Sequence, residues 1–120
     1  MYNVYEIGEL VGKIFTDVTA NDDTMSFESD TNHYRFYHEQ DCCESVYIHD
    51  IEGDLSDLIG TPILSAEEVM SHDPFGDVDY QDESHTWTFY KFATINGYVT
   101  VRWLGESNGY YSESVTFSKV

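Results

Sequence analysis

Residues 86–104 largely alternate between large apolar and polar side chains, and Asn96 and Gly97 interrupt the alternation. A period of two is typical of a strand with one buried face, and Asn-Gly strongly favours the tight turn of a β-hairpin. The pattern therefore predicts two antiparallel strands, 86–95 and 98–104, joined by a two-residue loop. This hairpin is the clearest structural feature that the sequence predicts.

The Asn-Gly loop also sets an expected register, in which Ile95 lies opposite Tyr98. Lys91 then lies opposite Arg102 on one face, where like charges are unfavourable, so we expect nearby carboxylates to compensate them. The other face is rich in aromatic and β-branched residues and should be core. Its expected pairs are Thr94 with Val99, Phe92 with Val101 and Tyr90 with Trp103.

Further segments have strand-like composition. Residues 14–20, 24–29 and 33–38 are separated by clusters of Asn, Asp and Thr, which predicts a three-stranded meander. Residues 46–48 fit either a short strand or an irregular buried link. A second Asn-Gly turn precedes residues 110–118, which we expect to return as the third strand of a C-terminal meander.

The middle of the chain holds one predicted helix. Asp54 is a good N-cap for a short helix near residues 54–59. Residues 63–69 are predicted as a strand. The alternative is a short helix from Ser65, because Ser65 and Glu68 fit a capping box.

These elements predict a mainly β fold, α+β at most. We expect an antiparallel sheet or a small barrel built from meanders. With 120 residues the chain is long enough for one core, so residues 1–120 should form a single domain. Hydrophobic residues at 41% and aromatic residues at 16% argue against disorder.

The net charge of −18 is the unusual property of the composition. No Lys or Arg occurs from Phe36 to Tyr90, where most of the 23 acidic residues lie. Such a charge steers a protein toward cationic surfaces and away from nucleic acids and anionic membranes. Solubility or a halophilic background is the alternative explanation. Within the acidic tract, residues 71–85 combine Pro, Gly and acids without periodicity, which predicts a mobile acidic loop.

One cluster has metal-ligand residue types: His38, Cys42, Cys43 and His49. Two thiolates and two imidazoles would suffice for a tetrahedral zinc site, but structural sites usually separate paired cysteines by two to four residues. Adjacent cysteines close a strained ring, so we expect reduced thiols and an intracellular setting. We therefore expect no metal and no cofactor.

Catalysis is not predicted. A reactive cysteine needs a positive neighbour to lower the pKa of its thiol, and the residues around Cys42 are acidic. The chain has no glycine-rich phosphate loop and no basic nucleic-acid patch. Its first ten residues lack the basic start and apolar run of a signal peptide, and no segment approaches the length of a membrane span.

Three strings carry a resemblance to a known group: YHEQDCCESVYI, DIEGDLSDLIG and SHTWTFYKFATINGYVTVRWLGESNGYYSESV. They resemble a widespread family of small phage and prophage proteins of unknown function. The resemblance implies a viral origin and expression in the host cytoplasm, and it brings no catalytic assignment.

The leading hypothesis is a phage-encoded acidic protein that inhibits a host defence nuclease, of the anti-CRISPR or anti-restriction type. Its carboxylates would imitate the phosphate array of a duplex and occupy the basic surface of a nucleic-acid-processing protein. We expect no direct contact with nucleic acid or membrane. The expected contact residues are Asp50, Glu52, Asp54, Asp57, Asp73, Asp77, Asp79, Asp82 and Glu83.

Two alternatives stay open. A small metal- or ligand-binding protein would use His38, Cys42, Cys43 and His49. A minor virion or assembly component is the other.

Overall fold

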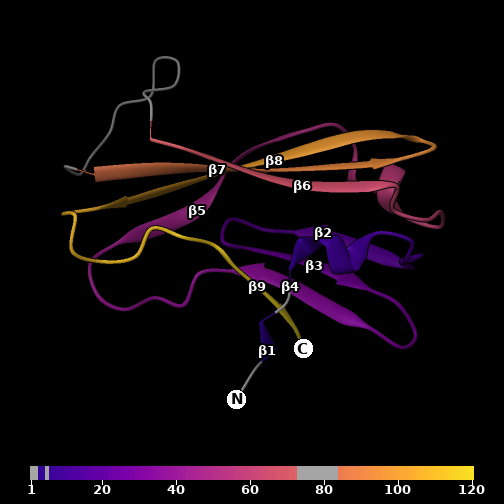
Figure 1. The fold of residues 1–120 in the computed structure, drawn as a ribbon, viewed down its shortest axis with the longest axis horizontal. Coiled ribbons are helices and arrows are strands. Elements are labelled where there is room, and N and C mark those ends of the chain that lie inside the picture. Colours follow the sequence, from indigo (N-terminus) through magenta and orange to yellow (C-terminus); the bar gives the residue numbers. More distant parts are fainter. Residues whose placement is uncertain (1–2, 5, 73–83) are drawn as a thin grey trace.

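Two antiparallel sheets make up the fold in a computed structural model that describes residues 3–4, 6–72 and 84–120 (Figure 1). The first sheet has the order β1 (Asn3–Val4), β9 (Thr116–Lys119), β4 (His33–Tyr37), β3 (Thr24–Glu28), β2 (Asp17–Ala20). The second sheet has the order β5 (Ser45–Glu52), β8 (Gly97–Ser107), β7 (Ser84–Thr94), β6 (Ser65–Ser71). The predicted mainly β, antiparallel class is confirmed.

Aromatic rings join the inward faces of the two sheets. Phe27 of β3 lies 5.1 Å from Phe92 of β7, and Phe36 of β4 lies 4.7 Å from Tyr90, measured between ring centroids. All four side chains are almost fully buried. Offset and tilted ring pairs at these distances add to the stabilisation that burial of apolar area already gives.

The predicted N-terminal meander is confirmed as β2-β3-β4. In β4 the side chains alternate between buried and half-buried, as the sequence pattern requires. The first turn is closed by Asn21, whose Oδ1 accepts hydrogen bonds from the backbone N–H groups of Asp23 and Thr24. Residues 14 and 15 do not extend β2; they form isolated bridges to Pro62 and Ile59.

The predicted hairpin is confirmed as β7–β8, but the predicted register is wrong. The turn residues are Ile95 and Asn96, so that Thr94 lies opposite Gly97. The cause lies in the segment around Asp57, which packs against the turn: the Thr94 hydroxyl donates to the Asp57 carbonyl and accepts from the Asn96 N–H. Gly97 lies directly against the Asp57 carboxylate, where a Cβ would come within 2.9 Å of Oδ2.

The corrected register separates the two cations that were expected to oppose each other. Lys91 lies opposite Thr100, and Arg102 lies opposite Phe89. The expected compensation by a carboxylate is present for Arg102, which forms an ion pair with Asp50. The core face is as predicted, with Tyr90, Phe92, Val99, Val101 and Trp103 buried.

The prediction that residues 110–118 form the third strand of a C-terminal meander is wrong. The strand that forms is β9, which covers only residues 116–119 and pairs with β4 and β1 in the first sheet. Residues 108–115 therefore cross from one sheet to the other. The crossing segment packs onto β8 at Gly105, where a Cβ would come within 2.8 Å of the Glu113 Cβ.

The central elements mostly follow the prediction. Residues 46–48 belong to β5, an eight-residue strand with a register irregularity between Ile48 and Asp50. The short helix is the 3₁₀ helix η2 (Leu55–Leu58), with Asp54 as its N-cap. The predicted strand at 63–69 is confirmed as β6, two residues further on, and the alternative helix from Ser65 is wrong.

The predicted acidic loop at 71–85 falls mainly on residues 73–83, which lie outside the described residues. Ser71 ends β6, and residues 84 and 85 begin β7.

Near the N-terminus, residues 7–10 form a second short 3₁₀ helix, η1 (Ile7–Leu10). In the described part of the chain, no helix has the length and apolar character that crossing a membrane would require.

Candidate functional site

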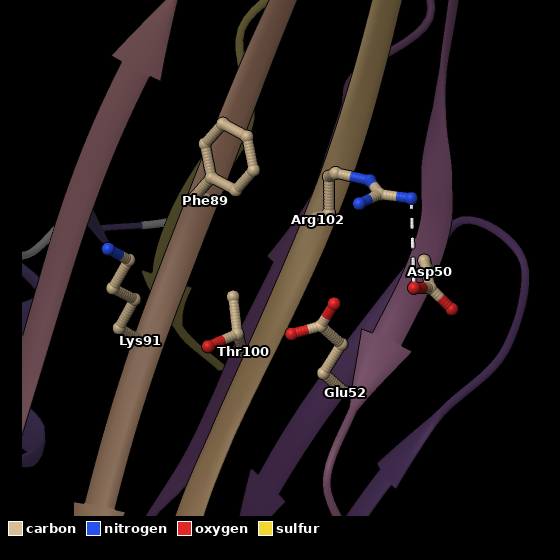
Figure 2. Close-up of a pocket in the computed structure, with 6 residues that line it drawn as sticks. All are labelled: Asp50, Glu52, Phe89, Lys91, Thr100 and Arg102. Atoms are coloured by element: carbon tan, nitrogen blue, oxygen red, sulfur yellow. Dashed lines mark ion pairs between the residues drawn. The ribbon is translucent and has the colours of Figure 1, made fainter. Parts of the chain in front are cut away.

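Two rows of three side chains cross the outward face of the second sheet, on strands β7, β8 and β5. The first row is Phe89, Arg102 and Asp50, and the second is Lys91, Thr100 and Glu52. These six residues line an open groove of about 280 Å³, named the outer groove below (Figure 2). The two cations and two carboxylates give its lining no net formal charge.

Arg102 is fixed at one end of the outer groove. Its Nη2 lies 3.6 Å from Asp50 Oδ2, and its Nε and Nη2 donate to His49 Nδ1 at 3.3 and 3.0 Å. The guanidinium lies over the Trp87 ring, 5.5 Å from its centroid. Trp87 points outward from the sheet and is nevertheless fully buried. Arg102 is therefore a preorganised positive group, because Arg combines bidentate donation with stacking on an aromatic face.

Of the four predicted acidic contact residues that the structure describes, only Asp50 and Glu52 line this groove. Asp54 instead caps η2, accepting from the Ser56 N–H at 3.0 Å and from its hydroxyl at 2.8 Å. Asp57 lies in η2 against the β7–β8 turn. The other five predicted residues lie outside the described residues: Asp73, Asp77, Asp79, Asp82 and Glu83.

Exposed carboxylates from three segments border β5, which is an end strand of the second sheet. The β2–β3 turn is held against β5 by a 2.7 Å hydrogen bond from the Ile48 N–H to the Asp22 carbonyl. A second cavity, of about 580 Å³, lies between that turn and residues 44–48. We call the exposed carboxylates of these three segments the acidic edge. They are Asp22 and Asp23 of the β2–β3 turn, Glu39 and Asp41 of the β4–β5 loop, and Asp50 and Glu52 of β5.

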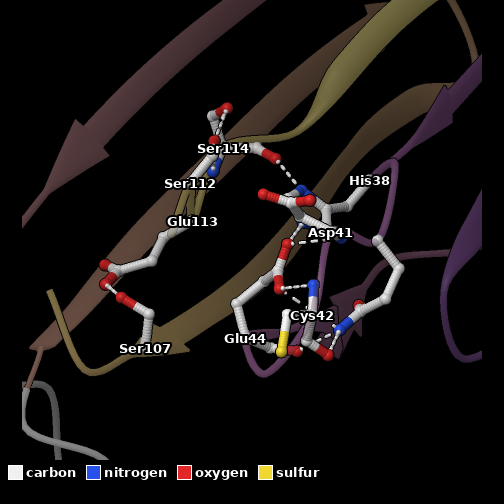
Figure 3. Close-up of polar contacts among 9 residues, drawn as sticks. His38, Asp41, Cys42, Glu44, Ser107, Ser112, Glu113 and Ser114 are labelled. Atoms are coloured by element: carbon white, nitrogen blue, oxygen red, sulfur yellow. Dashed lines mark hydrogen bonds and ion pairs between the residues drawn. The ribbon is translucent and has the colours of Figure 1, made fainter. Parts of the chain in front are cut away.

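A buried ion pair holds the β4–β5 loop in place (Figure 3). His38 Nε2 lies 2.8 Å from Glu44 Oε2, and His38 Nδ1 lies 2.7 Å from the Ser114 carbonyl oxygen. The side chains of His38 and Glu44 are 6% and 0% exposed. Because a carbonyl and a carboxylate only accept, the doubly protonated imidazolium satisfies both contacts. We call these three residues the histidine clamp.

The Glu44 carboxylate is surrounded by donors. It also accepts from the backbone N–H groups of Asp41 and Cys42, each at 2.9 Å. The His38 hydrogen bond, opposed by desolvation and helped by these backbone donors, lowers the pKa of the Glu44 carboxyl from 4.5 to about 2. Hydrogen bonds to the charged form of an acid have this effect. The arrangement fixes the loop and leaves no open position for a substrate at the carboxylate.

A second carboxylate, that of Glu113 next to Ser114, holds the crossing segment (residues 108–115) to β7 and β8. Glu113 Oε1 accepts from the Thr86 hydroxyl at 2.8 Å, and Oε2 accepts from the Ser107 hydroxyl. Desolvation raises the pKa of Glu113, but these hydroxyl donors outweigh it and the net shift is downward. Ser107, Glu113 and the nearby His72 do not form a nucleophilic triad, because the Ser107 hydroxyl donates to the carboxylate and His72 reaches only Thr86 and a carbonyl.

The four predicted metal-ligand residues are not brought together. His38 is engaged in the histidine clamp, and His49 accepts from Arg102 on the far side of β5. Cys42 and Cys43 form a disulfide and are both exposed, so the expectation of free thiols is wrong in this structure. The Glu44 carboxylate accepts from the backbone N–H groups of Asp41 and Cys42, which folds the loop tightly. Across residues 3–4, 6–72 and 84–120, no three His, Cys, Asp or Glu side chains are arranged to hold a metal ion.

The sequence pointed to four of the six groove residues, Asp50, Glu52, Lys91 and Arg102, but not to their meeting in one groove. Phe89 and Thr100 carried no signal of their own, and His49 was considered only as a metal ligand. One signal was present: two of the five cations alternate onto the outward face of a single hairpin. Nothing local indicated that His38 would contact Ser114, which is 76 residues away.

Comparisons with known proteins give a family. The family model described as Domain of unknown function (DUF7448) matches residues 8–117. No curated protein and no solved structure shows a significant match to the chain.

Proposed function

Because the chain belongs to the DUF7448 family, whose description names no activity, we propose a function from its surface: an acidic binding protein that inhibits a nuclease. In this proposal it is phage-encoded, acts in the host cytoplasm and blocks a CRISPR or restriction nuclease. The acidic edge would occupy the basic surface with which such an enzyme holds nucleic acid.

The acidic edge is the observation that supports this function. Its six exposed carboxylates come from β5, from the loop that leads into β5, and from the β2–β3 turn that is hydrogen-bonded to β5. Asp50 and Glu52 alternate outward on one strand, which places their Cα atoms roughly 7 Å apart. Duplex DNA carries about one charge per 1.7 Å of axis, which is denser than the spacing of these two carboxylates. The exposed acids of the neighbouring loop and turn add to the negative charge that a basic channel would meet.

The proposal moves the contact surface relative to the sequence-based prediction. Asp54 and Asp57 serve η2 and the hairpin turn, so we assign them a structural role. Asp22, Asp23, Glu39 and Asp41 take their place beside Asp50 and Glu52.

The experiment is a cleavage assay with purified restriction and CRISPR nucleases, in which this protein is titrated at rising salt. We expect inhibition of at least one enzyme, weakening as the Debye length falls from roughly 30 Å at 0.01 M salt to about 3 Å at 1 M. The test variant neutralises the edge with Asp22→Asn, Asp41→Asn and Glu52→Gln.

A matched control neutralises the same number of exposed acids elsewhere: Asp17→Asn, Asp30→Asn and Glu67→Gln. The edge variant should lose inhibition and the control should keep it. The proposal fails if no nuclease is inhibited, or if inhibition is indifferent both to salt and to the edge variant.

A further inference from the structure

The second row of the outer groove holds a cation and an anion that do not pair with each other. Lys91 and Glu52 flank Thr100 on the two neighbouring strands, so their Cα atoms lie about 10 Å apart (Figure 2). Both side chains are exposed, and within the described residues neither forms an ion pair or a side-chain hydrogen bond. In the first row, by contrast, Arg102 and Asp50 are joined.

From this geometry we propose that the outer groove binds a small zwitterion, a free α-amino acid with an apolar side chain. The ammonium of Lys91 takes the ligand's carboxylate, and the carboxylate of Glu52 takes its ammonium. The Thr100 hydroxyl lies between them and can both donate and accept. Charge-assisted hydrogen bonds of this kind are about twice as strong as neutral ones.

The rest of the lining determines what the ligand's side chain must be. Phe89 stands two residues from Lys91 on the same face of β7 and offers its ring beside the carboxylate position. The first row is closed to a second charged group, because Arg102 is already engaged by Asp50 and His49. An apolar or aromatic side chain therefore fits, and a charged one does not.

The size of the groove agrees with this class of ligand. Its volume of about 280 Å³ lies just below the roughly 300–1,000 Å³ of sites that hold drug-sized molecules. Glu52 belongs to both the outer groove and the acidic edge, but amino-acid binding is measured without a nuclease, so either proposal can fail alone.

Calorimetric titration of the full chain with L-phenylalanine and with L-leucine tests the proposal. We expect saturable binding below about 10 mM and a rise in Tm at saturation. N-acetyl-L-phenylalanine lacks the ammonium and L-phenylalanine amide lacks the carboxylate; each should bind at least about tenfold more weakly.

Two variants test which side chain binds which charged group of the ligand. The Lys91→Gln variant should bind L-phenylalanine and its amide with equal affinity. The Glu52→Gln variant should bind L-phenylalanine and its N-acetyl form with equal affinity. Asp30→Asn, at an exposed turn distant in sequence, should bind like the unchanged protein. No saturable binding of either amino acid, or equal binding of all analogues by the unchanged protein, would overturn the proposal.

Discussion

The histidine clamp and the outer groove use the same chemistry to opposite effect. Each places cationic and anionic side chains on neighbouring parts of the fold, but the clamp is buried and its contacts are 2.7 to 2.8 Å long. In the groove the one ion pair spans 3.6 Å, and Lys91 and Glu52 stay apart. Charges that are fully hydrogen-bonded and dry hold segments together, whereas open, unmatched charges remain available to something outside the chain.

The difference comes from the backbone that surrounds each pair. In the clamp, two N–H groups and a carbonyl converge on His38 and Glu44 and complete their hydrogen bonding. In the groove, the backbone groups of β7 and β8 are used by the sheet, and side chains have only one another. Breaking the clamp should therefore cost stability, and changing the groove should not.

The largest effect is expected from Gly105→Ala. The added Cβ would overlap the Glu113 backbone and displace the crossing segment that carries the Ser114 carbonyl. We expect a loss of about 3 kcal/mol in the free energy of unfolding, as for overpacked cores. Chemical denaturation measures it. Gly8→Ala is the matched control, since nothing lies within 4 Å of its Cβ position; equal losses in both variants would show that the crossing segment yields freely.

Next in size is the clamp itself. His38→Gln and Glu44→Gln each remove one charge of a buried pair and leave the other uncompensated, so each should lower Tm clearly. The double variant should lower Tm by less than the sum of the two single effects, because each single variant already loses the interaction between the two side chains. Thermal unfolding of the four proteins gives the coupling. Strict additivity would mean that the two side chains act independently.

Acid should remove the contribution of Glu44 to the stability of the fold. The pKa of Glu44 is lowered to about 2 in the folded protein from 4.5, so its contribution to stability is complete above about pH 4.5 and is lost as pH falls toward 2. Over that interval the stability of Glu44→Gln should fall less steeply than that of the unchanged protein. Glu52→Gln, in the groove, should keep the steeper slope. If stability fell with the same slope against pH in all three proteins, Glu44 would not contribute to the loss of stability in acid.

The smallest effect is expected in the groove. Lys91→Gln and Glu52→Gln remove exposed, unpaired charges, so each should change the free energy of unfolding by less than about 0.5 kcal/mol. Denaturant midpoints measure this. A loss as large as that of Gly105→Ala would mean that the groove is part of the scaffold, and the contrast with the clamp would disappear.

The strands could be predicted because their signal is local. Alternation along 33–38 and 86–104 identifies which side chains face the core, and it does so whatever the strand's partner is. The register of β7–β8 could not be predicted from Asn96 and Gly97, because contacts to Asp57 shift the turn by one residue. The sheet to which β9 belongs is decided by its packing on β4, which no local pattern encodes.

The candidate sites could be predicted only in part, because their residues meet through strand pairing. Asp50 and Glu52 were identified because of the charge around them, but Lys91 and Arg102 join them only through strand pairing. His38 and the cysteines were grouped by residue type and nearness in sequence. In the fold, His38 turns instead to Glu44 and to a carbonyl 76 residues away.

The position of β9 has a consequence for how this protein reaches its native state. Because β9 separates β1 from β4, the first sheet is incomplete until residues 116–119 arrive, after β7 and β8 in the sequence. Strands β6, β7 and β8 of the second sheet follow one another in the sequence and can pair early. Closing β4 onto β9 must first overcome the entropy of a loop spanning most of the chain. Folding should accordingly be slow for a chain of this length, with the β9 pairing as its late step.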